Sequence, residues 1–202
     1  MIIGIEGVSC TGKTTLALAL AARLGSTSVI PCYYHAAPDP SVLSALQANS
    51  EQDQLDALAI HLDIELLRLS CVQTAVERGC RVVLDRTVDT LLAHLRAVGE
   101  MNGLNVAGQA RALVAERIGQ GLAVVPEVTL LLKADHEVLA DRARTRMAMP
   151  ALYYDSVFTC GFHSHFQDPL TPTCLTVDAS RTLDQVLDQA FAVLEPHLAG
   201  QR

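Results

Sequence analysis

The stretch Gly7-Val8-Ser9-Cys10-Thr11-Gly12-Lys13-Thr14 decides the fold of this chain. The apolar run Met1-Ile2-Ile3-Gly4-Ile5 leads into it, and residues 13–24 follow it with helical spacing of their apolar side chains. A glycine-rich loop between a strand and a helix is typical of a phosphate-binding loop, because the glycines let backbone N–H groups turn inward and the helix N-terminus adds partial positive charge. The stretch therefore predicts a P-loop, against the alternative of a chance match in a glycine-containing turn.

The residue types within this stretch predict a task for each position. Gly7 and Gly12 permit the loop conformation, the Lys13 ammonium reaches the β- and γ-phosphates of ATP, and the Thr14 hydroxyl helps to hold Mg²⁺. ATP and Mg²⁺ are therefore the expected cofactors. The residues expected to bind ATP are Gly7, Ser9, Cys10, Thr11, Gly12, Lys13, Thr14 and Thr15.

Length and charge limit the remaining possibilities. The chain has 202 residues, half of them hydrophobic, which suits a single domain over residues 1–202. A formal net charge of −7 and the lack of a dense Lys/Arg block argue against a nucleic-acid partner. No uncharged apolar run reaches the roughly 18 residues of a membrane helix, and the first residues read as a strand and not as a signal peptide. We expect a cytoplasmic protein with six free cysteines and no membrane partner.

Apolar runs alternate with segments of helical period along the chain, a pattern that predicts an α/β fold in which helices cover both faces of a parallel sheet. A segment rich in Tyr, Phe and His between Pro150 and Pro172 is expected to be irregular and to act as a lid or substrate loop. The expected strands are Met1–Glu6, Ser28–Pro31, Arg81–Asp85, Glu127–Leu132 and Cys174–Val177, and the expected helices are Lys13–Leu24, Gln52–Arg78, Val88–Val98, Val106–Gln120, His136–Arg146 and Leu183–Leu198.

A second acidic element follows the third expected strand. Asp85 ends this strand at the edge where open α/β sheets bind ligands, so its carboxylate is expected to hold Mg²⁺ or to orient the attacking oxygen. Arg86 follows directly, and its guanidinium suits phosphate oxygens. The alternative is that Asp85 caps the next helix and Arg86 is a surface charge.

Arginines cluster near the end of the fifth expected helix. Arg142 and Arg146 are one helical turn apart and share a face, whereas Arg144 points elsewhere. Two guanidiniums on one face would offset charge on a transferring phosphoryl group, although a solvated face that complements the helix dipole is the alternative. The predicted catalytic residues are Lys13, Asp85, Arg86, Arg142 and Arg146.

The order of these motifs resembles thymidylate kinases and the related deoxynucleoside kinases, over nearly the whole chain. The matching landmarks are Ile5-Glu6-Gly7, Gly12-Lys13-Thr14-Thr15, Asp85-Arg86-Thr87, Arg142 with Arg146, and Val177-Asp178-Ala179-Ser180. The resemblance implies a P-loop NTPase fold of the nucleotide-kinase type, in three layers, with a five-stranded parallel sheet and a short lid at about residues 142–168. It also implies that Arg86 contacts the phosphate or the 5′-oxygen of an acceptor, and that Arg142 and Arg146 close over the transferred group.

The chain also departs from both groups. Thymidylate kinases usually carry an acid in the P-loop where this chain has Ser9, and Arg-Glu-Pro where this chain has Ala36-Ala37-Pro38-Asp39-Pro40. Deoxynucleoside kinases carry Glu-Pro near that place, with the glutamate acting as base on the 5′-hydroxyl. If Asp39 faces the acceptor, it favours an acceptor that carries a hydroxyl group. The alternative interpretation of Asp39 is an acid that initiates a Pro-flanked turn. The later Glu-Arg-Ser of deoxynucleoside kinases is Asp85-Arg86-Thr87 here, which favours the thymidylate kinases.

Several further side chains are candidates for the acceptor site. Aromatic rings and histidines suit a planar acceptor, and core or lid packing is the alternative. A long expected helix carries three candidates to face the acceptor: Asp63, Glu65 and Arg68. In the resembling families a helix at this place forms a dimer surface, so the resemblance implies a homodimer; packing of this helix in the protein's own core is the alternative. Zinc is not expected, because the Cys and His residues near 160–174 fit no zinc spacing. The predicted substrate-binding residues are His35, Asp39, Arg86 and Tyr153.

Three functional hypotheses follow from these features. The leading one is a kinase that moves the γ-phosphoryl group of ATP to a nucleoside monophosphate, thymidylate or a close analogue. The second keeps the P-loop and changes the acceptor to a nucleoside or another small hydroxyl compound. The third is a GTPase-like switch, because Leu132-Lys133-Ala134-Asp135 is similar to the guanine-specifying Asn-Lys-x-Asp, although Leu132 lacks the asparagine amide.

Overall fold

In the part of the chain that the computed structural model describes, residues 1–44, 49–146 and 155–199, five strands form one parallel sheet. Its order is β2-β3-β1-β4-β5, so the first strand lies in the middle. The register pairs Ile5 with Asp85 on one side and with Leu130 on the other. The carboxyl ends of β1 and β3 therefore meet at the same edge of the sheet. The strands are β1 (Ile2–Glu6), β2 (Thr27–Ile30), β3 (Arg81–Asp85), β4 (Val128–Lys133) and β5 (Cys174–Asp178).

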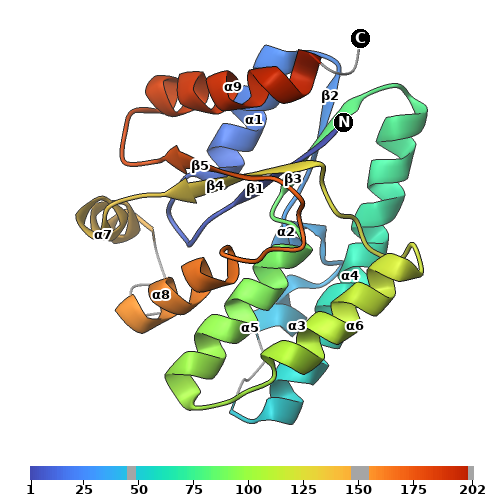
Figure 1. Cartoon of the computed structure of the whole chain (residues 1–202), viewed down its shortest axis with the longest axis vertical. Helices are drawn as coiled ribbons and strands as arrows, with labels where there is room; N and C mark the ends of the chain where they lie inside the picture. Colours follow the sequence, from blue (N-terminus) through green and yellow to red (C-terminus); the bar gives the residue numbers. More distant parts are fainter. Residues whose placement is uncertain (45–48, 147–154, 200–202) are drawn as a thin grey trace.

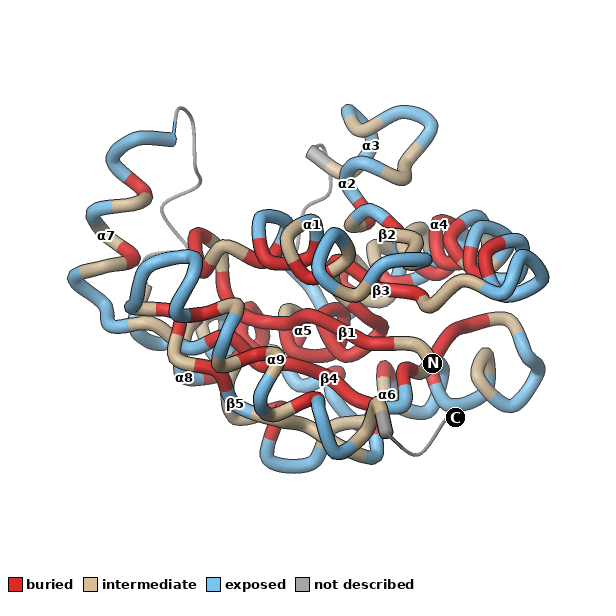
Figure 2. Tube along the Cα trace, turned by 90° about the horizontal axis from the view of Figure 1, so that it is seen from above, coloured by how far each residue is buried: buried red, intermediate tan, exposed pale blue. Residues whose placement is uncertain are grey.

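Helices cover both faces of this sheet (Figure 1), as the alternation of apolar runs and helical segments predicted. Helices α1 and α9 pack on one face, and α4, α5, α6 and α8 lie on the other. Figure 2 shows that the tube is buried along most of β1, β3 and β4, which explains why these strands are continuous apolar runs. The described helices are α1 (Lys13–Leu24), α2 (Tyr33–Ala36), α3 (Pro40–Ser44), α4 (Glu51–Glu77), α5 (Val88–Asn102), α6 (Ala107–Gly119), α7 (His136–Arg144), α8 (Ser156–His165) and α9 (Leu183–Ala199).

The segment expected to be irregular between Pro150 and Pro172 contains helix α8, and this expectation was wrong for residues 156–165. The Asp155 carboxylate caps the helix by accepting a hydrogen bond from the Val157 N–H at 2.7 Å. Phe158 and Phe162, four residues apart, lie on one face and are buried within a cluster that includes residues of α5. Phe162, one of the aromatic residues that suggested an acceptor site, is thus a core residue.

The contact between α5 and α8 depends on a glycine. A Cβ atom on Gly161 would lie 2.8 Å from the Ala97 Cα, closer than side chains approach a backbone atom. The two helices therefore pack at this point because position 161 lacks a side chain. The short helices α2 and α3 lie where the sequence predicted none, since four or five residues are too few for a helical period. No helix of the described residues has the length and apolar character needed to cross a membrane.

Candidate active site

The loop between β1 and α1 has the conformation that the glycine-rich stretch predicted. Gly7 has a φ of 143°, and a Cβ atom there would lie 2.6 Å from the Leu132 carbonyl oxygen of β4. Only glycine therefore lets the chain leave β1 so close to its neighbour. Cys10 and Gly12 also have positive φ values, of 66° and 91°, before the helix begins at Lys13.

The Lys13 side chain lies inside this loop. Its Nζ donates hydrogen bonds to the Val8 carbonyl oxygen at 2.7 Å and to the Thr11 hydroxyl at 3.5 Å. Burial, followed by the charge of Arg86, lowers the pKa of Lys13 to about 7, while Asp85 and Glu6 act in the opposite direction. Phosphate oxygens placed in the loop would favour the charged ammonium, so the loop suits an anionic ligand.

Asp85 lies at the carboxyl end of β3, across from the start of α1. Its Oδ2 accepts a hydrogen bond from the Thr14 hydroxyl at 2.5 Å. Its Oδ1 is buried, and no other described residue donates a hydrogen bond to it. Mg²⁺ prefers oxygen ligands and is usually held by one or two carboxylates together with substrate phosphates. Thr14 and Asp85 therefore fit a magnesium ion at the mouth of the loop.

Arg86 follows in a strained backbone conformation, with a φ of 72°. Its N–H donates to the Ile5 carbonyl oxygen at 3.1 Å, and its Nη1 donates to the Thr90 hydroxyl at 3.1 Å. The half-buried guanidinium is close enough to Lys13 to lower its pKa. The alternative that Asp85 caps the next helix is wrong, because Thr87 is the N-cap of α5 and accepts from the Asp89 N–H at 3.1 Å.

Glu6, the last residue of β1, is a site residue to which the sequence assigned no role. Its carboxylate is fully buried and accepts hydrogen bonds from the Thr87 N–H at 2.6 Å, from the Thr87 hydroxyl at 2.8 Å and from the Thr90 hydroxyl. Burial raises the pKa of Glu6, and the charge of Arg86 and the threonine hydrogen bonds oppose this. The sequence feature that could have identified Glu6 is an acidic residue at the end of an apolar strand, directly before a P-loop.

Arg68 of α4 reaches the same turn from the other side. It is 1% exposed and donates to the Arg86 carbonyl oxygen at 2.6 Å and to the Pro31 carbonyl oxygen at 3.0 Å. Its Nη1 lies 2.6 Å from Oε2 of Glu65, which is equally buried. The guanidinium also stacks over the Tyr33 ring at 4.3 Å from its centroid. Glu65 and Arg68 thus form a buried support under the site.

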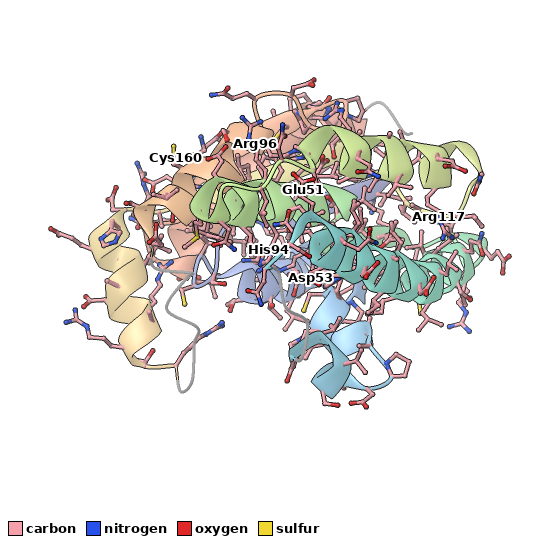
Figure 3. The ribbon with its side chains drawn as sticks, turned by 90° about the horizontal axis from the view of Figure 1, so that it is seen from below. Glu51, Asp53, His94, Arg96, Arg117 and Cys160 are labelled. Atoms are coloured by element: carbon pink, nitrogen blue, oxygen red, sulfur yellow. The ribbon has the colours of Figure 1, made fainter. Side chains whose placement is uncertain are left out.

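His94 lies near Arg86 and near a second histidine, His61, and the sequence predicted a role for neither. His94 belongs to α5, in the helical layer viewed from below in Figure 3. Burial, and then the charges of His61 and Arg86, lower the pKa of His94 to about 4. His61 of α4 donates from Nδ1 to the Ala57 carbonyl oxygen at 2.7 Å, and burial lowers its pKa. The His94 imidazole is therefore neutral at pH 7.

Arg142 reaches the phosphate loop from α7. Its Nη1 donates to the Cys10 carbonyl oxygen at 3.4 Å. Arg146 is exposed and lies beyond the end of the helix, which stops at Arg144 and not at Arg146 as predicted. Arg144 forms an ion pair with Asp141 within the last turns of the helix, and this pairing was not anticipated. The structure therefore brings Arg142 to the P-loop but does not place Arg146 on the same helical face.

Of the predicted substrate-binding residues, Arg86 belongs to this cluster, whereas the hydrogen bonds of His35 and Asp39 in the described structure stay within their own turns. His35 is exposed, and its Nδ1 is 3.3 Å from the Cys32 sulfur. The Asp39 carboxylate is exposed and accepts from the Ser41 N–H at 2.9 Å and the Ser41 hydroxyl at 2.6 Å, hydrogen bonds that lower its pKa. Tyr153 lies outside the described residues. Within the described ranges, no group of three or more His, Cys, Asp or Glu side chains is arranged to hold a metal ion.

Comparison with known proteins defines the class first. The chain has the fold of the P-loop kinases: thymidylate kinase from Candida albicans superposes with a TM-score of 0.72 and 22% identity, over 98% of this chain and 92% of the other. Deoxyadenosine kinase from M. mycoides with bound dATP gives a TM-score of 0.66 and 13% identity, over 96% of this chain and all of the other. No family model matches the sequence.

Within that class the chain is similar to thymidylate kinases and deoxynucleoside kinases, as its motifs predicted. A probable thymidylate kinase from Archaeoglobus fulgidus is 24% identical over 204 residues, 98% of this chain and 96% of the relative. These similarities, together with the P-loop and the Asp85-Arg86 turn, support a P-loop nucleoside or nucleotide kinase.

Proposed function

We propose that this protein transfers the γ-phosphoryl group of ATP to a nucleoside monophosphate, thymidylate or a close analogue. One observation carries the proposal: the Thr14 hydroxyl and the Asp85 carboxylate meet at 2.5 Å at the mouth of the P-loop, and Arg86 follows in the same turn. A magnesium-ligand pair and a guanidinium are thus combined beside a phosphate loop. The probable thymidylate kinase relative supports the choice of acceptor.

Each group then has a task in positioning and charge. The backbone of the P-loop and Lys13 would bind the phosphates of ATP. Thr14 and Asp85 would hold Mg²⁺, which when bound neutralises charge on the β- and γ-phosphates. Arg86 would bind the acceptor, and Arg142, already at the Cys10 carbonyl, would approach the transferred group from α7.

The chemistry of the acceptor side favours a monophosphate. An anionic phosphate oxygen needs charge compensation, whereas a hydroxyl gains from a positioned base. Residues 31–35, which follow β2, contain no acid, and the Asp39 carboxylate bonds within its own turn. Arg86 supplies the charge that a monophosphate requires. A nucleoside acceptor is the alternative, supported by the likeness in fold to a deoxyadenosine kinase.

The test is ADP formation with ATP-Mg²⁺ and a panel of nucleosides and nucleoside monophosphates, with the products identified by mass spectrometry. We expect ADP formation that depends on a monophosphate, and loss of at least about 100-fold in Arg86→Met, because removing a charged contact to a transition state costs several kcal/mol. Arg96→Met is the matched control: it removes the same functional group, but Arg96, in α5, is 43% exposed and pairs with Glu100. Product only from nucleosides would establish the alternative, and binding of GTP without ATP would indicate a switch.

A further inference from the structure

Glu6 is linked to Arg86 through a single hydroxyl group. The Thr90 hydroxyl donates its proton to Oε2 of Glu6 and accepts a hydrogen bond from Nη1 of Arg86 at 3.1 Å. A hydroxyl has one proton to donate, so these two contacts fix its direction. The carboxylate thus determines which side of the Thr90 oxygen faces the guanidinium.

Glu6 also holds the backbone of the turn that carries Arg86. Its Oε1 accepts from the Thr87 N–H, one residue after Arg86, while Arg68 donates to the Arg86 carbonyl oxygen from the opposite side. A φ of 72° is unfavourable for a residue with a side chain and persists only where surrounding contacts impose it. Glu6 and Arg68 are two such contacts, and they come from β1 and α4.

The arrangement leaves most of the guanidinium available. Arginine has five N–H donors in a fixed fork, and within the described part of the chain the Thr90 hydroxyl is the group that receives one of them from Arg86. Fixing one corner of a planar fork limits its rotation, and the remaining donors keep a defined direction for an anion. Binding such an anion then costs less side-chain entropy.

We propose that Glu6 is a positioning residue for phosphoryl transfer, and that it acts through Thr90 to aim the Arg86 guanidinium at the acceptor. This inference rests on the proposed function, in which Arg86 binds the acceptor. Glu6 touches neither ATP nor the acceptor in this scheme. Through Thr90 and Arg86, it contributes to acceptor recognition.

The test uses Thr90→Val, which keeps the shape and removes the relay, because Glu6→Gln alters a fully buried carboxylate and risks misfolding. We expect kcat/KM for the acceptor to fall by about 10-fold or more, as for the loss of a hydrogen bond to a charged group. The KM for ATP should stay within about twofold, because in the described structure the Thr90 hydroxyl bonds to Glu6 and Arg86 and to no residue of the P-loop. Thr90→Ser restores the hydroxyl and should recover activity to within about threefold of the wild type.

Thr129→Val is the matched control, since Thr129 is also buried and its hydroxyl donates to the Thr171 hydroxyl at 3.0 Å, with no hydrogen bond to Arg86 or Glu6 in the described structure. Equal losses in Thr90→Val and Thr129→Val, or a parallel rise in the KM for ATP, would show a general structural role and overturn the proposal. Unchanged acceptor kinetics in Thr90→Val would also overturn it.

A second measurement separates this proposal from the proposed function. The Nη1–H signals of Arg86 in a low-temperature NMR spectrum of the full chain, assigned by their loss in Arg86→Lys, should exchange slowly with solvent in the wild type and rapidly in Thr90→Val, because Nη1 is the atom that donates to the Thr90 hydroxyl. If the wild type uses no acceptor, the proposed function fails, and slow exchange would still show that the relay fixes Arg86. Rapid exchange in both proteins would overturn the relay even where the wild type is active.

Discussion

Replacing Arg68 by methionine should strongly destabilise the protein. The Arg68 guanidinium and the Glu65 carboxylate are each 1% exposed, and their nearest atoms are 2.6 Å apart. Arg68→Met removes the charge partner of Glu65 and a donor to the Pro31 and Arg86 carbonyl oxygens. Breaking a buried pair from one side costs about 3–5 kcal/mol, because the remaining charge stays buried. For a chain of this size that corresponds to a melting temperature lower by about 6–20 °C.

Urea unfolding followed by circular dichroism measures this cost as a change in the free energy of unfolding. Arg96→Met serves as the control, because Arg96 and Glu100 form an exposed pair four residues apart on α5, and such pairs contribute about 0.3–0.5 kcal/mol. The double variant Glu65→Leu/Arg68→Met should be more stable than Arg68→Met alone, since it leaves no lone charge. A loss below about 1 kcal/mol in Arg68→Met would refute the reasoning. A double variant that loses the full sum of both single changes would refute it as well.

Further expectations concern the pH dependence of nucleotide binding, Asp39 as a catalytic base, and the packing of two helices. The pKa of Lys13 is lowered to about 7 in the free protein, and bound phosphate favours the charged ammonium. The affinity for ADP, measured by calorimetry, should therefore fall as pH rises from 7 to 9. An affinity that does not change over this pH range would contradict the environment assigned to Lys13. Asp39→Asn should change turnover by less than about threefold, because the exposed carboxylate bonds within its own turn; loss of transfer with unchanged ATP affinity would instead identify a base for a hydroxyl acceptor. Gly161→Ala should lower the free energy of unfolding by about 1–3 kcal/mol, because the new Cβ would lie 2.8 Å from the Ala97 Cα. Gly108→Ala is the control: its Cβ enters open space on α6, so the variant should be neutral or more stable by up to about 1 kcal/mol. Equal free energies of unfolding for the two variants would contradict this account.

The order of helices and strands could be predicted from sequence because the signals are local. The third strand and the first helix were predicted with the bounds that the structure has, Arg81–Asp85 and Lys13–Leu24. Each of the other four strands differs from its predicted bounds by a single residue, at one end or at both. Apolar runs and helical spacing report burial of neighbouring residues directly. Helix α8 was missed because its buried face includes Phe158 and Phe162, in a segment whose aromatic composition equally suggested ligand contacts.

The P-loop itself was determined by sequence, since its glycines, Lys13 and Thr14 are adjacent in the chain and their roles depend on that adjacency. The surroundings of Arg86 were decided by tertiary structure alone. Glu6 comes from β1, Thr90 from α5 and Arg68 from α4, and they meet because the sheet order places β1 beside β3 while α4 packs against β3 on one face. No spacing in the sequence encodes such contacts, because they arise only when strands and helices distant in the chain are brought to the same edge of the sheet.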